Sequence, residues 1–256
     1  MNKIMNKIEK TCVLVVSCDR YRDMWSPFFT LFFRYWPDCP YDIYLCSNEI
    51  RYEDKRVKTI LTGEDTSWSS NLKRCLERIP SEYVILFQED FLFTRTVHTE
   101  KVIKLSQVIR KHEAACLRLM PSPAPDKIDK EDPCLGEISK GALYRVSLQA
   151  AIWEKAELYD LLKDGESPWD FEHIGSGRSD LIDKKFLSIN NRNRDTWPFD
   201  YFSTAIVQGK WVREAVAICK REGIFIDTAH RQVEPILMPM HRKCIANLRR
   251  VKRMLA

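Results

Sequence analysis

The apolar run at residues 83–87 (YVILF) is followed directly by Gln88, Glu89 and Asp90. Such a run is typical of a strand buried on both faces, and ligands of open α/β sheets bind at the carboxyl ends of the strands. Two carboxylates are costly in a partly buried site unless they are paired. Mg²⁺ or Mn²⁺ that bridges Glu89 and Asp90 to a diphosphate would offset this cost. The alternative is a strand-end turn whose acids cap a helix or pair with an arginine.

A second group of candidates begins at Ser167, in the string SPWDFE. The Ser-Pro pair predicts the start of a helix, and Ser167 with Asp170 fits a capping box, which gives Asp170 a structural role. Glu172 lacks that explanation. A carboxylate whose pKa is raised beside aromatic side chains suits the general base that sugar transfer needs, and Trp169 and Phe171 would supply the aromatic wall and stack on sugar rings. The alternative for Glu172 is an ordinary first-turn acid favoured by the helix dipole.

The elements that must position these residues follow from the apolar periodicity. Short apolar runs alternate with segments whose apolar residues repeat at helical spacing. The predicted strands are residues 12–17, 42–47, 57–61, 83–87 and 115–120, and the predicted helices are residues 26–36, 68–79 and 99–111. The first helix is expected to start at Ser26-Pro27. This alternation predicts an α/β domain with a mostly parallel central sheet and helices on both faces.

The second half of the chain is less regular. We expect hairpins at residues 137–147 and 205–212, helices at residues 154–163 and up to residue 222, and many turn residues at 165–180. Within the last of these, residues 175–179 (GSGRS) form either a flexible cationic loop over a diphosphate or a plain turn. A boundary near residue 120 would separate two halves of one domain, a nucleotide-sugar-binding half at residues 1–120 and an acceptor-binding half at residues 121–240.

Composition excludes several classes of protein. The chain has 256 residues, of which 45% are hydrophobic and 30% charged, so collagen-like and disordered chains are excluded. The net charge of +5 arises from residues 241–256, which hold six Lys or Arg and no acid. The body is therefore about neutral, and we expect no nucleic-acid partner. The tail has the spacing of a short basic amphipathic helix for an anionic membrane surface, with a solvated terminal helix as the alternative.

Glycine and cysteine usage adds two expectations. The first glycine is Gly63, so no glycine-rich phosphate loop follows the first predicted strand, and a metal ion or cationic side chains must neutralise a phosphorylated ligand. The nine cysteines show no C-x-x-C spacing, and the N-terminus shows no apolar signal-peptide core. No stretch approaches 18 apolar residues. These features indicate a cytoplasmic protein.

Residues 63–93 (GEDTSWSSNLKRCLERIPSEYVILFQEDFLF) resemble small bacterial glycosyltransferases of the GT-A type, which act in polysaccharide, lipopolysaccharide and capsule biosynthesis. In that family an acidic loop with a tryptophan, an amphipathic helix and an apolar strand precede a DxD-like motif, which holds the metal and the diphosphate of a nucleotide-sugar. The resemblance implies Mn²⁺ or Mg²⁺ as the cofactor. It makes Asp90 the stronger metal ligand and Glu89, which replaces the commoner aspartate, the weaker one.

The same resemblance implies further donor-binding residues. It places Asp19 and Arg20 beside the nucleotide base, and Asp65, Trp68 and Gln88 around the rest of the donor. Two of these residues have plainer explanations, since either Asp65 or Ser67 would serve as the cap of the helix and Trp68 would belong to the core stripe of that helix.

A second segment, at the predicted acceptor side, also resembles this family. The string PWDFE resembles the acceptor-site segment of the family, which implies that Trp169, Asp170 and Phe171 contact the acceptor and that Glu172 is the base of an inverting transfer. Residues 147–153 resemble the segment that packs against it.

These residues together predict a glycosyltransferase. It would move a sugar from a nucleotide-sugar, with a UDP-sugar as the first guess, to a hydroxyl of a glycan or lipid-linked acceptor, at the inner face of the membrane. Because some GT-A enzymes use a C-terminal histidine as a metal ligand, His230 is a further candidate, with a surface position as the alternative. The alternative function is a non-catalytic glycan- or nucleotide-binding module.

Overall fold

The computed structural model describes residues 10–190 and 197–235. Contacts within the chain divide it into two compact units, Met1–Ser203 and Thr204–Ala256. The first unit contains a nine-stranded sheet in the order β3-β2-β1-β4-β9-β6-β10-β8-β7. This sheet takes strands from both sides of residue 120.

The elements of the first unit are bounded as follows. The sheet consists of β1 (Thr11–Val16), β2 (Asp42–Ser47), β3 (Val57–Leu61), β4 (Tyr83–Gln88), β6 (Cys116–Arg118), β7 (Lys127–Ile128), β8 (Leu135–Glu137), β9 (Ala151–Glu154) and β10 (Phe186–Ile189). A separate pair is formed by β5 (Leu92–Arg95) and β11 (Asp200–Phe202). The helices are the 3-10 helix η1 (Asp19–Tyr21), α2 (Arg22–Tyr35), α3 (Trp68–Arg78), α4 (Thr99–Lys111), α5 (Lys155–Leu161) and α6 (Pro168–Ser179).

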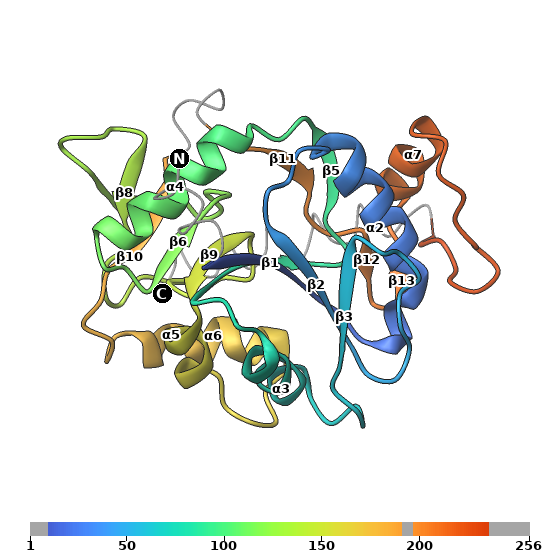
Figure 1. Ribbon diagram of the computed structural model, residues 1–256, viewed down its shortest axis with the longest axis horizontal. Coiled ribbons are helices and arrows are strands. Elements are labelled where there is room, and N and C mark those ends of the chain that lie inside the picture. The colour runs from blue at the N-terminus through green and yellow to red at the C-terminus, as the bar shows by residue number, and fades with distance from the viewer. Residues whose placement is uncertain (1–9, 191–196, 236–256) are drawn as a thin grey trace. The chain divides into compact units, whose positions relative to one another are not determined.

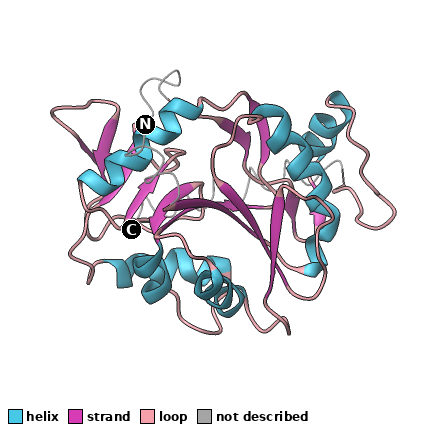
Figure 2. Cartoon of the chain, viewed as in Figure 1, coloured by secondary structure: helices cyan, strands magenta, loops and turns pink. Residues whose placement is uncertain are grey.

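The strand pairings confirm the predicted fold class. Strand β1 is parallel to β2 and β4, β2 is parallel to β3, and β6 is parallel to β10. In the sheet, β9 and β8 run against the other strands. Helices cover both faces, with α2 and α4 on the upper side of the view and α3, α5 and α6 on the lower side (Figures 1 and 2). The fold is therefore α/β with a mostly parallel central sheet.

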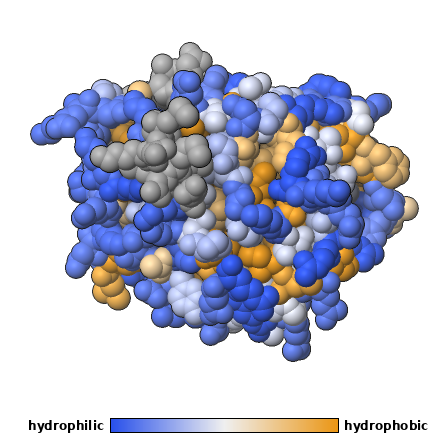
Figure 3. Space-filling view, in the orientation of Figure 1, coloured by the Kyte–Doolittle hydropathy of each residue, from blue (hydrophilic) through white to orange (hydrophobic). Residues whose placement is uncertain are grey.

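Side chains along β1 alternate between the two faces of the sheet, and each face has its own hydrophobic core. Cys12, Leu14 and Val16 point to one face, where they join a buried cluster with apolar residues of α3, α5 and α6. The opposite face is covered by aromatic side chains of α2, and the Phe32 ring lies 5.5 Å from the Phe93 ring. Most of the surface visible in Figure 3 is hydrophilic, with hydrophobic residues showing mainly towards its centre.

Helix α2 starts earlier than predicted. The expected start at Ser26-Pro27 is wrong, because α2 begins at Arg22 and Pro27 lies inside it. The 3-10 helix η1 leads into α2, and its first residue, Asp19, is held by the loop after β2. A tertiary contact thus fixes the helix start one turn before the local Ser-Pro signal.

The hairpin predicted at residues 137–147 is also absent. In the described chain β8 pairs with β7 and β10, and residues 138–147 run as a loop. The Arg145 side chain is buried and donates from Nε to the Ile138 carbonyl at 3.2 Å, which closes the loop on itself. A buried arginine therefore replaces the ladder of a hairpin.

The second unit, described by itself, contains β12 (Ile206–Val207), β13 (Lys210–Trp211) and α7 (Arg213–Arg221). Strands β12 and β13 form the predicted hairpin. The basic tail at residues 241–256 lies outside the described residues. Among the helices that are described, none is both long and apolar enough to cross a membrane.

Candidate active site

The carboxyl ends of β1, β2, β3 and β4 meet at one edge of the sheet because these strands are parallel. The Asp19 carboxylate, after β1, accepts hydrogen bonds from the backbone N–H groups of Asn48 and Glu49, both at 3.0 Å, after β2. The Asp19 N–H in turn donates to Asn48 Oδ1 at 3.1 Å. Asp19 therefore joins two strand ends, and Arg20 is exposed beside it. Their role beside a nucleotide base stays a prediction.

Two predicted carboxylates lie near the Cys18 thiol at this edge. Burial, together with the charges of Glu89 and Asp65, raises the pKa of Cys18 to about 11. Asp65 Oδ1 accepts a hydrogen bond from Asn71 Nδ2 at 2.7 Å. Of the two candidate caps, Asp65 and Ser67, it is Ser67 that caps helix α3. The structure thus brings together acids that follow β3 and β4.

Three polar atoms at this edge lack a partner. Trp68 Nε1, Asn71 Oδ1 and Gln88 Nε2 are buried and have no hydrogen-bond partner within the described chain. The Trp68 ring packs against the buried cluster and lies 5.3 Å from the Phe171 ring, as the core explanation predicts, while its role beside the donor stays a prediction. Buried polar groups are nearly always hydrogen-bonded, so exceptions that gather at one place in the fold call for an explanation. Asn71 carried no signal in the sequence beyond its place on α3.

The acidic pair lies directly after β4. Glu89 is buried and Asp90 is half-buried. Phe91, the next residue, stacks on Tyr201 of β11 with 4.5 Å between ring centroids and 13° between ring planes. Burial raises the pKa of Tyr201, and the charge of Asp90 raises it further. Asp90 therefore lies close to Tyr201, which the sequence did not single out.

Tyr201 connects the acidic pair Glu89 and Asp90 to the residues just before β9. Its hydroxyl accepts a hydrogen bond from the Ala150 N–H at 2.9 Å and donates to Gln149 Oε1 at 2.9 Å. One residue earlier, the Leu148 N–H donates to Glu172 Oε1 at 2.7 Å. A continuous chain of contacts thus runs from the acidic pair Glu89 and Asp90 to Glu172, the candidate base.

Helix α6 begins as predicted. Asp170 N–H donates to Ser167 Oγ at 3.2 Å, and Ser167 N–H donates to Asp170 Oδ2 at 3.0 Å, which is the predicted capping box. The bond from the Ser167 hydroxyl, aided by that from its backbone N–H, lowers the pKa of Asp170. Trp169 is exposed, but Phe171 has no exposed surface and lies in the core near Trp153. Of the two residues predicted to form the aromatic wall, only Trp169 is therefore exposed to a ligand.

The GSGRS segment is not a loop. Residues 175–179 form the end of α6. Arg178 is bound to the Glu166 carboxylate, with 2.7 Å between Nη2 and Oε2. A Cβ on Gly175 would lie 3.4 Å from the Phe171 ring, which is an ordinary van der Waals distance. The idea of a flexible cationic flap at these residues is therefore wrong.

Arg118, at the end of β6, is a buried cation that the sequence argument missed. Its guanidinium donates to the carbonyl oxygens of Pro123 at 2.7 Å, Tyr144 at 2.6 Å and Arg145 at 3.2 Å. Burial lowers the pKa of Arg118, while Cys116, Glu172 and Tyr201 act in the opposite direction. A charged residue inside the apolar run ACLRLM was the available signal.

His230 lies in the second unit, where it is exposed and its backbone N–H donates to Asp227 Oδ1 at 3.1 Å. Residues 10–190 and 197–235 contain no group of three or more His, Cys, Asp or Glu side chains arranged to hold a metal ion. Glu89 and Asp90 remain the candidate ligands, as a pair.

No family model matches the sequence, and no curated protein matches it. Among solved structures, UDP-glucose pyrophosphorylase complexed with UDP-glucose is 8% identical with a TM-score of 0.49, covering 76% of this chain and 92% of that one. Residues 1–349 of S. aureus TarS are 12% identical with a TM-score of 0.47, covering 77% and 60%. A cytidylyltransferase from Leptospira borgpetersenii is 10% identical with a TM-score of 0.47, covering 89% and 99%.

Proposed function

We propose that the chain is a glycosyltransferase that moves a sugar from a nucleotide-sugar to a hydroxyl of a glycan or lipid-linked acceptor. The proposal rests on the polar groups that gather where the carboxyl ends of β1, β2, β3 and β4 meet. Two carboxylates, Glu89 and Asp65, lie near one thiol there, and the unpartnered buried atoms of Trp68 and Gln88 lie on residues expected to touch the donor. Acids with unsatisfied donors and acceptors at strand ends suit a polar, phosphorylated ligand.

The acidic pair fits Mg²⁺ or Mn²⁺. Both ions prefer carboxylate oxygens and are usually held by one or two carboxylates together with substrate phosphates and water. Glu89 and Asp90 supply two such groups, so a third protein ligand is not required. When bound, the cation stabilises the charge of the leaving diphosphate. A UDP-sugar is the first donor to test.

On the acceptor side, Glu172 would take the proton from the attacking hydroxyl. The bond to the anomeric carbon forms as the bond from that carbon to the diphosphate breaks, and the nucleoside diphosphate leaves with inversion. The Leu148 N–H holds Glu172 Oε1 and so fixes the carboxylate. Trp169 is exposed one turn earlier on α6.

The proposal is tested by nucleotide binding and turnover. UDP with Mn²⁺ should raise the Tm of the full chain, and Asp90→Asn should abolish most of that rise. Glu82→Gln is the matched control, because Glu82 lies at the opposite end of β4 in an exposed pair with Lys10. The Glu82→Gln variant should respond like the wild type.

Two results would reject the donor site. One is a full Tm rise in Asp90→Asn, and the other is no Tm rise with any of UDP, GDP, CDP or ADP. Nucleotide binding without release of nucleoside diphosphate from any donor, with or without acceptor, would favour the non-catalytic module.

A further inference from the structure

Tyr144 has a backbone conformation that tyrosine rarely adopts. Its φ is 55°, in the left-handed region, although it is neither glycine nor asparagine. Such strain persists only where the surrounding structure holds it, and it concentrates at functional sites. Tyr144 lies in the loop between β8 and β9, which is the loop that replaced the predicted hairpin.

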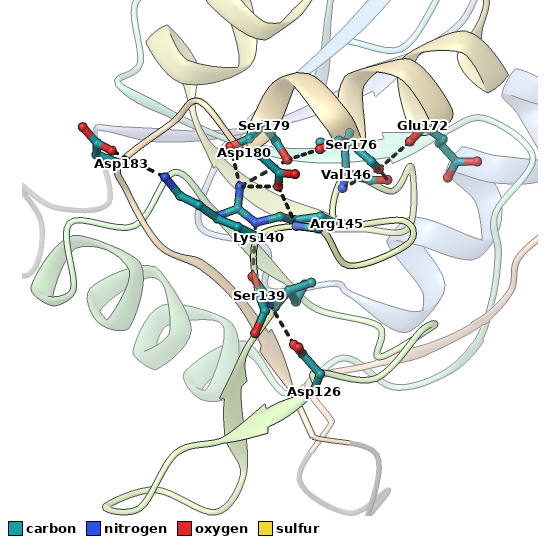
Figure 4. Close-up of polar contacts among 12 residues, drawn as sticks. Asp126, Ser139, Lys140, Arg145, Val146, Glu172, Ser176, Ser179, Asp180 and Asp183 are labelled. Carbon is teal, nitrogen blue, oxygen red and sulfur yellow. Dashed lines mark hydrogen bonds and ion pairs between the residues drawn. The ribbon is translucent and has the colours of Figure 1, made fainter.

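The backbone around Tyr144 is held on both sides. The buried Arg118 donates to the Tyr144 carbonyl at 2.6 Å. Next in the chain, Arg145 is also buried and donates to Ser179 Oγ at 3.2 Å, and the Val146 N–H donates to Ser176 Oγ at 3.1 Å (Figure 4). Two buried arginines and helix α6 therefore fix the loop in which Tyr144 stands.

This rigid loop presents side chains outward instead of burying them. The half-exposed Tyr144 ring lies 5.2 Å from the ring of His173, which is exposed on α6. Trp169, one turn before His173 on the same side of the helix, is 70% exposed. Residues three apart on a helix are also neighbours, so Trp169 lies beside Glu172 as well. Tyr144, His173 and Trp169 thus lie along the first two turns of α6, near the proposed base.

We infer that Tyr144, His173 and Trp169 form a platform that binds a sugar ring of the acceptor glycan. One part of this inference rests on the proposed function, namely that the acceptor hydroxyl of the bound sugar faces Glu172. Aromatic faces bury the apolar C–H face of a sugar, while a nearby carboxylate and imidazole accept or donate hydrogen bonds to its hydroxyls. The exposed Asp170, whose carboxylate lies near His173, disfavours an anionic membrane as the occupant and favours a neutral polyol.

A glycine substitution separates function from structure. Glycine adopts positive φ without strain, so Tyr144→Gly is expected to keep the wild-type Tm or exceed it. Glu113→Gly is the matched control, because Glu113 has φ 48° and is exposed in the turn after α4. Tyr144→Phe keeps the ring and serves as the conservative variant.

Saturation-transfer NMR with maltotriose, cellotriose and chitotriose measures the platform without any nucleotide. At least one trisaccharide should bind the wild type, Glu113→Gly and Tyr144→Phe alike, and its Kd should rise at least tenfold in Tyr144→Gly. Trisaccharide binding that is absent in the wild type, or unchanged in Tyr144→Gly, overturns the inference. UDP and Mn²⁺ are tested separately. If trisaccharide binding depends on Tyr144 but no nucleotide binds, the proposed function fails and the platform stands.

Discussion

The backbone N–H of Leu148 donates to Glu172 Oε1 across 2.7 Å, which joins the chain before β9 to the second turn of α6. The other oxygen, Oε2, has no hydrogen-bond partner among the described residues. A carboxylate held by one oxygen keeps its orientation and leaves the second oxygen for a substrate. This arrangement is what a general base requires, since position matters before pKa.

Glu172→Gln is expected to keep the fold and lose transfer. The amide oxygen still accepts the Leu148 N–H, but the amide cannot take a proton, and loss of a general base lowers kcat about 100-fold or more. Release of nucleoside diphosphate in the presence of acceptor, together with Tm, checks this. Glu82→Gln is again the control, because Glu82 lies in an exposed pair with Lys10 away from α6. Full activity of Glu172→Gln would remove Glu172 from the mechanism.

The alkylation rate of the Cys18 thiol should report on the charge of Glu89 at the sheet edge where the donor is proposed to bind. Its pKa of about 11 leaves about 1% thiolate at pH 9, and the thiolate is the nucleophile. Alkylation by iodoacetamide, followed by mass spectrometry, is therefore expected to be slow at pH 8 and to accelerate up to about pH 11. Because Glu89 raises this pKa, Glu89→Gln should accelerate alkylation at a fixed pH.

The exposed Cys134 serves as the internal reference for that measurement. Equal Cys18 rates in the wild type and Glu89→Gln would mean that the Glu89 charge does not act on the donor edge.

Arg118→Met should destabilise the protein, because it leaves three carbonyl oxygens without their donor. The expected loss in the free energy of unfolding is about 2–4 kcal/mol, measured by urea denaturation. Arg74 offers a control, because it donates to the Glu64 carbonyl at 2.9 Å from a partly exposed position. Arg74→Met should cost less than about 1 kcal/mol. Similar losses in both variants would contradict a special role for burial at Arg118.

Ser167→Ala should cost about 1 kcal/mol of stability through the lost N-cap. The pKa of Asp170 lies below its usual 3.8 because Ser167 bonds its carboxylate. A depressed folded pKa adds stability that is present above pH 3.8 and is lost as the pH falls through the lower, folded value. The Tm difference between the wild type and Ser167→Ala should therefore shrink between about pH 6 and about pH 2.5. A difference that is constant with pH would show that Asp170 takes no part.

The sequence predicts those parts of the fold that depend on local pattern. The strands Asp42–Ser47 and Val57–Leu61 and the helix Thr99–Lys111 occur with the predicted bounds, because their apolar period and their burial agree. The capping box at Ser167 was predictable for the same reason, since its two partners are three residues apart. The acids after β4 were located by the end of an apolar run.

Only the tertiary structure decides the rest. The start of α2 depends on contacts from Asp19 to a loop about 30 residues away, and the loop around Tyr144 depends on the buried Arg118 and Arg145. The bonds that link Tyr201 to Ala150 and Glu172 to Leu148 join residues 51 and 24 apart. Hydrogen bonds between distant residues leave no periodic trace in a sequence, because only the folded sheet brings their partners within reach.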